Sequence, residues 1–544
     1  MAQLSGTPVL ILKEGSERSR GRDAQSNNIM AAKVIAESVR TALGPKGMDK
    51  MLVDSFGDVT ITNDGATILK EIDVQHPAAK ILVEVAKTQD TETGDGTTTA
   101  VILAGEFLKN AEELIKDKIH PTVIVEGYNK ATIKALEILD SIATDIGEDN
   151  KDIQKKAAIT SMSSKIVGGS ADYLANIAVE AIGLIKEQKE VGWEADLDNI
   201  SIQKKQGESV EDTHLIKGLI IDKEIVHSGM PKTIKNAKIA LLEAALEIEK
   251  TEFDAKISIT KVDQMQAFLA QEEEMLRKMV RKIKEAGADI VLCQKGIDDL
   301  IQHFLSKEGI AAVRRIKKSD IEKLSKATGA KIISNIETIK NTDLGNAGLI
   351  EERRIGNDNM IFIEECTEPK AISILIRGGT QMIVDEADRA LHDALCVVRN
   401  LVNEPKAVIG GGAPEIEVAK GLRSYADTLS GREQLAVQSF AKAMEIIPRT
   451  LAENAGLDPI DILVDLRSKH GVGNKDVGVD VLGGKVGDLK NKAVWEPVMV
   501  KKQAIKSASE ATQMILRIDD VISSKGGAPG GPPGGPPGGM EDED

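Results

Sequence analysis

The chain has 544 residues, of which 41% are hydrophobic, 29% are charged and only 2% are aromatic. This balance predicts a globular protein of about three or four domains, at roughly 100–200 residues each. The formal net charge of −16 argues against a nucleic-acid binder, which needs a basic surface and, for single strands, aromatic side chains that stack on bases.

The cysteines and the apolar runs indicate the compartment. Cys293, Cys366 and Cys396 lie far apart and form no CxxC pair, which is typical of a reducing compartment and predicts no zinc site. The apolar run near the N-terminus is too short for a signal peptide, and no stretch approaches the roughly 20 apolar residues of a membrane span. We therefore expect a soluble cytoplasmic protein.

The N-terminal part of the chain is predicted to be mostly helical. "NNIMAAKVIAESVRTAL" carries an apolar stripe with helical spacing and ends at "GPKG", a turn by its proline and glycines. "MLVDSFGDVTITNDG" then alternates with a period of two, which predicts a strand hairpin followed by a type I′ turn at Asn-Asp-Gly. Further helices are expected in "AAKILVEVAKTQ", "AVILAGEFLKNAEELI" and "PTVIVEGYNKATIKALEIL".

From about 215 to 370 the pattern changes. Short apolar runs such as "KIALLEAAL", "ADIVLCQ" and "NMIFIEEC" alternate with helical segments such as "IDDLIQHFLSKEG", which predicts an α/β domain. One amphipathic run within it, around residues 250–285, either packs in a core or presents an adaptable sticky surface. Its apolar members are Met265, Phe268, Leu269, Met275, Leu276 and Met279.

After about residue 405 the chain is again predicted to be helical. Its last segment, "GGAPGGPPGGPPGGMEDED", has a low-complexity composition that buries too little surface to fold, so residues 524–544 are expected to be a disordered tail. Two helical parts therefore flank an α/β middle. They are either separate domains or one helical domain that is split by an insertion.

The stretch from Gly94 to Gly105, "GDGTTTAVILAG", is the strongest candidate site. The first turn of the expected helix offers free N–H groups, a positive dipole end and threonine hydroxyls to a phosphate. Asp95 is out of place beside a phosphate unless it holds a Mg²⁺ ion that bridges to the phosphate oxygens. The alternative is a tight turn followed by threonines that only cap a helix.

Four other motifs have a functional and a structural interpretation. "LGPKG" brings bare backbone close to a nucleotide or merely ends a helix, and "VIGGGAPE" is a second anion-binding turn or a flexible linker. In "LHDAL", Asp393 is a catalytic acid or an ion-pair partner of Arg389 on a solvated helix face. "TSMSSK" contacts a γ-phosphate through its lysine or is a polar loop. The seven histidines form no metal-ligand pattern, and His392 is assigned to packing or to the surface.

Taken in order, these motifs resemble one family. "TALGPKGMDKMLVDSFGDVTITNDGATIL", "HPAAKILVEVAKTQDTETGDGTTT", "LHDAL", "GGGAPEIEVA", "SGREQLAVQSFAKAMEIIPRTLAENAG" and "VWEP" are similar to segments of the group II chaperonins, particularly those of archaea. The resemblance covers residues 18–523. Two departures are the Gly/Pro-rich tail and Ala66, which follows "NDG" where valine is expected.

The resemblance implies a multidomain α and α/β chaperonin fold. A helical equatorial ATPase domain would comprise residues 1–145 and 405–523, and a small α/β intermediate domain residues 146–214 and 370–404. An α/β apical domain, residues 215–369, would be inserted between them. Its helical protrusion, about residues 245–280, would act as a built-in lid.

The resemblance also implies roles for individual residues. Asp64 and Asp393 would be the catalytic acids, Asp95 would bind Mg²⁺, and Lys165 would sense the γ-phosphate when the intermediate domain closes. The ATP site would comprise Leu43, Gly44, Pro45, Gly94, Gly96, Thr97, Thr98, Thr99, Ser161, Ser164, Lys165, Gly411, Asp480 and Glu496.

The implied partners are non-native polypeptides and further copies of the chain, in two stacked rings of usually eight subunits. Two end strands, Val9–Leu12 and Ile515–Ile522, would bracket the stem-loop "MLVDSFGDVTIT" of a neighbouring subunit. Two rival interpretations remain. A small-molecule kinase would need an acceptor pocket, for which no motif is present, and a non-catalytic scaffold is disfavoured by the intact Asp64, Asp95 and Asp393.

Overall fold

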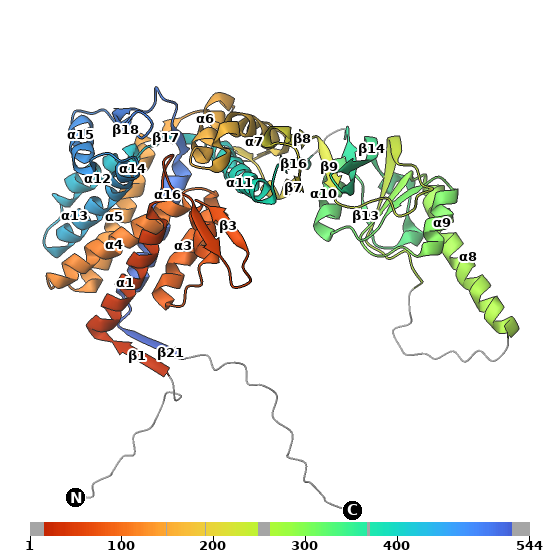
Figure 1. The fold of residues 1–544 in the computed structure, drawn as a ribbon, viewed down its shortest axis with the longest axis horizontal. Helices are drawn as coiled ribbons and strands as arrows, with labels where there is room; N and C mark the ends of the chain where they lie inside the picture. The colour runs from red at the N-terminus through yellow and green to blue at the C-terminus, as the bar shows by residue number, and fades with distance from the viewer. Residues whose placement is uncertain (1–15, 148, 191, 249–261, 367–369, 525–544) are drawn as a thin grey trace, which may run out of the picture.

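The computed structural model describes residues 16–524, apart from 148, 191, 249–261 and 367–369. Three bodies follow one another along an arch (Figure 1). A helical body contains both ends of the described chain, a small body holds α6, α7 and α11, and the third body is an α/β structure built around a sheet.

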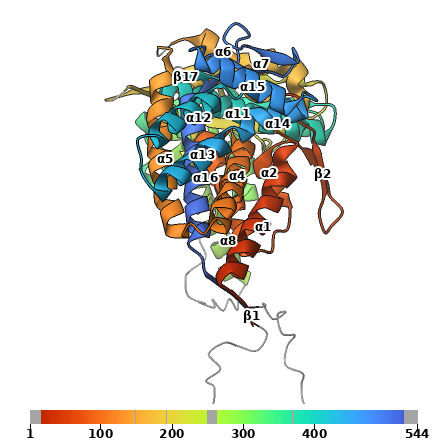
Figure 2. The same ribbon diagram turned by 90° about the vertical axis from the view of Figure 1, so that its left-hand side faces the viewer.

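The helical body is assembled from both ends of the sequence. One hydrophobic core joins residues from Ile29 to Leu139 with residues from Val408 to Leu516, and Figure 2 shows the two sets of helices packed side by side. The N-terminal set is α1 (Gly21–Arg40), α2 (Gly65–Glu71), α3 (Pro77–Thr93), α4 (Thr97–Lys116) and α5 (Pro121–Ile142). The C-terminal set is α12 (Ala413–Ala426), α13 (Arg432–Met444), α14 (Ile446–Asn454), α15 (Pro459–Gly471) and α16 (Val498–Leu516).

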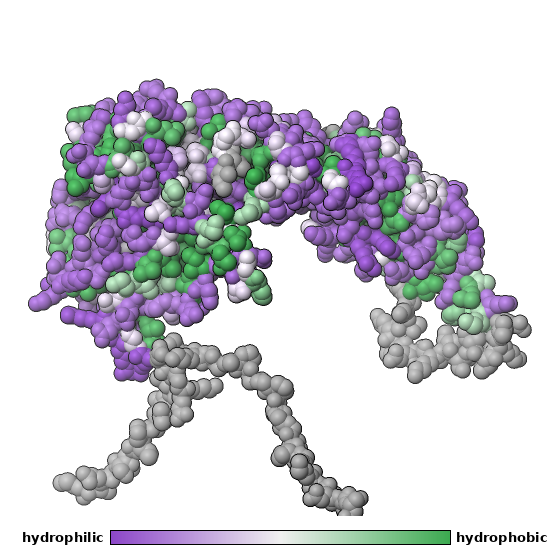
Figure 3. All heavy atoms as spheres, in the orientation of Figure 1, coloured by the Kyte–Doolittle hydropathy of each residue, from purple (hydrophilic) through white to green (hydrophobic). Residues whose placement is uncertain are grey.

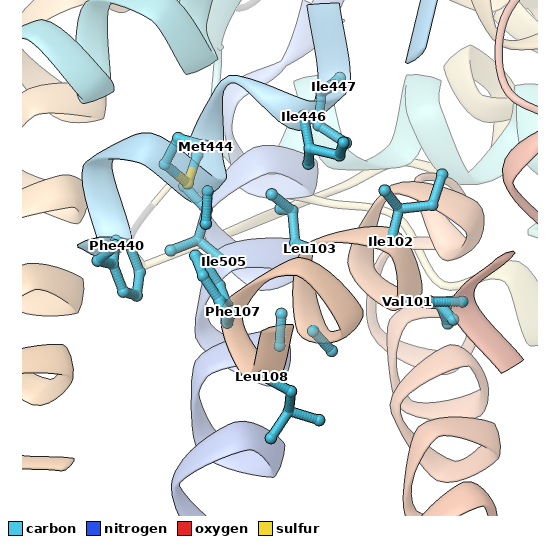
Figure 4. Close-up of a cluster of buried hydrophobic side chains, with 14 of the residues drawn as sticks. Val101, Ile102, Leu103, Phe107, Leu108, Phe440, Met444, Ile446, Ile447 and Ile505 are labelled. Atoms are coloured by element: carbon cyan, nitrogen blue, oxygen red, sulfur yellow. The ribbon is translucent and has the colours of Figure 1, made fainter. Parts of the chain in front are cut away.

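An aromatic cluster lies at the centre of this core. The rings of Phe107 on α4 and Phe440 on α13 are stacked, with centroids 4.1 Å apart, and both contact the edge of Tyr128. The buried hydroxyl of Tyr128 donates to the carbonyl of Phe107 at 3.0 Å. Figure 4 shows Ile505 of α16 beside Phe107. With Tyr128 on α5, four helices from the two ends of the chain meet here.

Short strands complete the helical body. The predicted hairpin is confirmed as β2 (Lys50–Val53) and β3 (Val59–Thr62). The sheet β20–β17–β4 joins Trp495–Pro497, Lys406–Ile409 and Thr144–Asp145. A second hairpin consists of β18 (Val477–Asp480) and β19 (Lys485–Asp488).

Two local predictions are wrong. Asn-Asp-Gly does not form a type I′ turn, because Asp64 has an extended backbone (φ −69°, ψ 123°) and caps α2 instead. Ile515 lies in the last turn of α16, which ends at Leu516, and the terminal strand β21 is Asp520–Ser524, paired antiparallel with β1 (Ser16–Arg20). The predicted strand Val9–Leu12 lies outside the described residues.

The small middle body has its own core. Helices α6 (Lys151–Met162), α7 (Ala171–Ile185) and α11 (Gln381–Asn403) pack beside the sheet β7–β16–β8, whose strands are Ile200–Gln206, Ile372–Gly378 and His214–Ile216. The chain thus passes through this body twice. The hairpin of β5 (Glu187–Lys189) and β6 (Gly192–Glu194) lies at its surface.

The α/β body confirms the mixed pattern predicted for the middle of the sequence. Its seven-stranded sheet runs in the order β12-β11-β10-β14-β15-β9, with β13 also paired to β10. The strands in chain order are Gly218–Ile221, Thr233–Leu242, Ile290–Cys293, Ala311–Val313, Ile332–Ile333, Gly345–Ile355 and Asp358–Glu364. Buried residues of α9 (Asp299–Lys307) and α10 (Lys318–Thr328) join the cores beside it.

The amphipathic run belongs to α8 (Val262–Ala286), which has two different halves. Leu276, Val280 and Ile283 are buried in the core of the α/β body. By contrast, Met265 and Leu269 are 56% and 53% exposed. The core interpretation is therefore confirmed only for the C-terminal half, whereas the N-terminal half, where α8 projects away from the body (Figure 1), carries exposed apolar side chains. Part of the predicted lid, residues 249–261, lies outside the described residues.

A second hydrophobic surface covers the β2–β3 hairpin, where Met51, Val53 and Phe56 are 67%, 62% and 91% exposed. Figure 3 shows hydrophobic surface in this region and again near the N-terminal end of α8. Both are larger than the isolated apolar side chains of an ordinary surface. Among the described residues, no helix is long and apolar enough to cross a membrane.

The shared core predicts a large effect of truncating its centre. We expect Phe440→Ala to lower the free energy of unfolding by about 3–5 kcal/mol, because the cavity would open between helices from both ends of the chain. Denaturant unfolding followed by circular dichroism measures this loss. The control Ile133→Ala, at a side chain that is 56% exposed, should change stability by less than about 0.5 kcal/mol. Equal effects of the two variants would contradict the described packing.

Candidate active site

A cavity of about 420 Å³ opens between the helical body and the middle body. Its wall is drawn from segments that lie hundreds of residues apart in the sequence. Of the predicted site residues, all except Gly94 line it: Leu43, Gly44, Pro45, Asp64, Asp95, Gly96, Thr97, Thr98, Thr99, Ser161, Ser164, Lys165, Asp393, Gly411, Asp480 and Glu496.

The first turn of α4 forms one wall of the cavity. Gly96 caps this helix with φ 79°, a backbone conformation that favours glycine. The three threonines that follow are buried, and the first N–H groups of a helix have no carbonyl partner within it. Gln89 donates to the carbonyl of Asp95 at 2.8 Å and so fixes the loop. This wall suits an anion.

Asp95 carries an unusual carboxyl group. Burial, together with the negative charges of Asp393 and Glu496, raises its pKa to about 7 despite the hydrogen bond from Gly96, which lowers it. That bond joins the Gly96 N–H to Asp95 Oδ1 at 2.7 Å. A carboxylate that is crowded by other carboxylates beside an anion site fits a hard divalent cation, which takes oxygen ligands and relieves the repulsion.

Asp64 lies next to the first turn of α4 and caps α2. Its Oδ2 accepts hydrogen bonds from the N–H and the hydroxyl of Thr67, at 2.8 and 2.7 Å, and its Oδ1 accepts one from the Thr97 hydroxyl at 3.2 Å. Burial alone would raise the pKa of Asp64, but the Lys165 charge and the Thr67 hydrogen bonds lower it below its usual value. Asp64 is therefore an ionised acceptor at neutral pH.

Asp393 projects from α11 and is held by Lys165. The Lys165 ammonium donates to Asp393 Oδ2 at 2.6 Å and to the carbonyl of Arg389 at 3.2 Å. Burial opposes the charge on Lys165, but Asp393 and Asp64 together raise its pKa. The alternative pairing of Asp393 with Arg389 is absent among the described contacts, because Arg389 pairs with Glu386 at 2.7 Å. Asp393 thus belongs to the cavity.

Further contacts, which the sequence did not predict, hold α11 and the end of α6 against the helical body. Arg399 and Asn400 on α11 donate to the carbonyls of Glu92 and Thr93, at 2.7 and 2.9 Å. The Asn63 amide donates to the carbonyl of Ser164. Nothing in the sequence pattern marks these residues, because each is an ordinary polar side chain whose partner is a distant backbone carbonyl.

Gly94 is not among the residues that line the cavity, and helix packing explains why a glycine is needed there. It ends α3 with φ 68°, and a Cβ atom there would lie 2.2 Å from Cβ and 2.3 Å from Sγ of Cys396 on α11. The glycine therefore allows α11 to pack against the end of α3. Its predicted contact with a nucleotide rests on the sequence alone.

Two more predicted carboxylates, Asp480 and Glu496, line the cavity. Asp480, at the end of β18, accepts from the Gly483 N–H at 2.9 Å and pairs with Lys492 at 2.7 Å. Gly411, with φ 66°, accepts a hydrogen bond through its carbonyl from the Val479 N–H at 2.9 Å. Glu496, on β20, pairs with Lys501 at 2.5 Å. The sequence did not single out Lys501 or Lys492, which look like ordinary surface lysines.

One further acidic residue was missed. Ligand atoms of Asp90, on α3, His392 and Asp393 all lie within 4.8 Å of one another. Burial raises the pKa of Asp90, and the charges of Asp64 and Asp393 add to this effect. His392 is about half exposed, in agreement with its assignment to the surface. The cluster of carboxylates around the cavity is thus larger than the motifs indicated.

Comparison with known proteins identifies the family of the chain. Residues 35–526 match the model of the TCP-1/cpn60 chaperonin family. The chain is 59% identical to a thermosome subunit of Pyrococcus horikoshii over 96% of this chain and 95% of the relative. It is 59% identical to thermosome subunit alpha of Archaeoglobus fulgidus, over 97% of this chain and 96% of the relative. A thermosome subunit of Methanopyrus kandleri is 57% identical, over 96% of this chain and 97% of the relative. The chain therefore belongs to the TCP-1/cpn60 chaperonin family.

Proposed function

We propose that this chaperonin binds Mg-ATP in the cavity and uses its hydrolysis to enclose and fold non-native polypeptides. The observation that carries the proposal is the convergence of Asp64, Asp95, Asp393 and Lys165, from four separate segments, on one cavity in a member of this family. The thermosome names of the relatives support an assembly of many subunits. Two stacked rings, usually of eight subunits each, are our expectation.

The cavity supplies complementary groups for each part of the nucleotide. The first turn of α4 and the Gly44 backbone would bind the phosphates through N–H groups and hydroxyls. Asp95 would hold Mg²⁺, which neutralises charge on the phosphate oxygens. Glu496, Asp480 and Gly411 also line the cavity, and we assign the base and ribose to them.

Asp64 and Asp393 are the proposed catalytic acids. An ionised carboxylate beside the γ-phosphate orients the attacking water and accepts its proton. In this structure the Asp393 carboxylate is already engaged by Lys165, because its Oδ2 accepts the Lys165 hydrogen bond at 2.6 Å. A bound phosphate gives Lys165 an alternative anionic partner. If the Lys165 ammonium moved from Asp393 to the phosphate, Asp393 would be free to act on the attacking water. Hydrolysis would then depend on the position of the middle body over the cavity.

We also assign the three bodies to functions. The helical body would be the equatorial ATPase domain, the middle body the intermediate domain and the α/β body the apical domain. The exposed methionines and leucines of α8 would contact non-native chains when the lid is open. The hydrophobic β2–β3 hairpin would be covered by a neighbouring subunit.

The first prediction concerns Asp393. Replacing Asp393 with Asn or Ala should reduce the rate of ATP hydrolysis by about 10²–10⁴-fold, because the proton acceptor is lost, while ATP still binds. Phosphate release and calorimetric ATP titration measure the two quantities. Asp385→Ala is the matched control, since Asp385 lies on the same helix but pairs with Lys204 at 2.9 Å. Phosphate release at the wild-type rate by the Asp393 variants would contradict the assignment of Asp393 as a catalytic acid.

The second prediction concerns the pH dependence of metal binding. Asp95 has a pKa of about 7, so a proton competes with the metal below pH 7 and no longer does so above it. We expect the affinity for Mn²⁺, a paramagnetic substitute for Mg²⁺, to rise about tenfold per pH unit up to about pH 7 and then to level off. Electron paramagnetic resonance measures free Mn²⁺. Asp95→Asn should bind weakly at every pH, and an unchanged slope in this variant would place the metal elsewhere.

The third prediction concerns the lid. Its deletion should spare the core-forming Leu246 and Leu276, so we would replace residues 249–270 with a flexible linker. The ring should still hydrolyse ATP but no longer protect an enclosed substrate from protease. The double variant Met265→Ser/Leu269→Ser, which keeps the lid length, should weaken capture of unfolded protein. Full protection after the deletion would refute the lid function.

A further inference from the structure

A buried lysine lies in the wall of the cavity beside Glu496. Lys501, near the start of α16, has a side chain that is only 9% exposed. Its ammonium lies 2.5 Å from Glu496 Oε2 and 3.1 Å from Glu415 Oε1. The three residues come from α16, β20 and the first turn of α12, so the lysine joins three elements that meet at the cavity wall.

This cluster contains two carboxylates and one ammonium group. Burial opposes the charge on Lys501, but Glu415 and Glu496 together raise its pKa, so the lysine stays protonated. Glu415 is almost fully buried, and its Oε2 has no hydrogen-bond partner among the described residues. A small void of about 10 Å³ adjoins Glu415, Lys501 and Thr99. Removing one member of such a buried cluster leaves an uncompensated charge.

The cluster fixes the orientation of Glu496. Strand β20 pairs with β17, with Glu496 opposite Val408, which fixes the backbone. On one side, Lys501 binds Oε2. On the other, Gly410 approaches so closely that a Cβ atom there would lie 2.1 Å from Glu496 Oε1. The carboxylate is thereby held between an ammonium group and bare backbone at the cavity wall, with its side chain 20% exposed.

We propose that Lys501 is a positioning residue that makes the cavity selective for ribonucleotides, by holding Glu496 ready to accept hydrogen bonds from ribose hydroxyls. The inference rests on the proposed ATP site. A fixed carboxylate gains charge-assisted hydrogen bonds from a sugar hydroxyl, and it is left unpaired by a deoxy sugar. A carboxylate that swings freely would adapt to either sugar and would not discriminate.

A general effect of the Lys501 charge is a competing explanation for any change in nucleotide affinity, because Lys501 also reduces the negative potential near the phosphates. The double variant Lys501→Met/Glu415→Gln separates the two effects. It carries the same net charge as the wild-type cluster, since one cation and one anion are removed together, yet Glu496 loses its ammonium partner. The double variant also avoids leaving both Glu415 and Glu496 without a cation in the cavity wall. We therefore expect it to fold, whereas Lys501→Met alone is expected not to. Glu415→Gln is the matched control, because it keeps the Lys501–Glu496 pair.

The experiment measures dissociation constants of Mg-ATP, 2′-deoxy-ATP and 3′-deoxy-ATP by calorimetry on the full-length assembly. Wild type and Glu415→Gln should prefer ATP over at least one deoxy analogue by about tenfold or more. The double variant and Glu496→Gln should lose most of this preference, mainly through weaker ATP binding. Equal weakening for all three nucleotides, or an unchanged preference in the double variant, would overturn the proposal.

The outcomes also separate this inference from the proposed function. If wild type binds none of the three nucleotides, the ATP site itself is wrong. If wild type binds ATP selectively and Glu496→Gln keeps that selectivity, the ribose is recognised elsewhere. The inference about Lys501 then fails while the proposed ATP site stands.

Discussion

The crowding of carboxylates around one cavity is the constraint on which the active site depends. Asp64, Asp90, Asp95, Asp393 and Glu496 lie close enough to influence one another, as the raised pKa values of Asp90 and Asp95 indicate. Like charges in a partly buried site repel strongly unless cations compensate them. Two buried lysines provide part of this compensation, Lys165 near Asp393 and Lys501 near Glu496. The remaining imbalance, centred on Asp95, is the physical argument for a bound divalent cation.

This distribution of charge would link nucleotide binding to movement of the middle body. Lys501 lies within the helical body, and both of its carboxylate partners, Glu415 and Glu496, belong to that same body. Lys165 lies at the boundary between two bodies, and its partner Asp393 is on α11. A γ-phosphate would compete with Asp393 for the same ammonium group. The ion pair is therefore a contact that nucleotide binding would weaken, and its loss would release Asp393, the proposed catalytic acid.

The sequence predicted which segments form the site because each carries an unusual local pattern. Glycines beside an acid and threonines at a helix start predict the wall formed by α4, and period-two alternation predicts the β2–β3 hairpin. The residues that hold these segments in place through hydrogen bonds and ion pairs were not predictable from the sequence. Lys501, Arg399 and Asn400 are unremarkable in sequence, and only the packing of distant elements brings them to a carboxylate or a carbonyl.

The wrong predictions have the same origin. The type I′ turn at Asn63–Gly65 was a local inference, but Asp64 instead caps α2 and faces Thr97 of another helix. Gly94 stays a predicted nucleotide contact, and the structure adds a packing reason for this glycine, because its lack of a Cβ atom makes room for Cys396. The expected strand from Ile515 begins later because apolar residues there complete the last turn of α16.

A cryo-electron microscopy structure of the assembly with Mg²⁺, ADP and aluminium fluoride would test the central claim most directly. We predict that Lys165 contacts the fluoride that mimics the γ-phosphate, that Asp393 faces the position of the attacking water, and that Asp95 coordinates the metal. If Lys165 still binds Asp393 in that complex and the metal lies away from Asp95, the proposed coupling of binding, release and hydrolysis is contradicted.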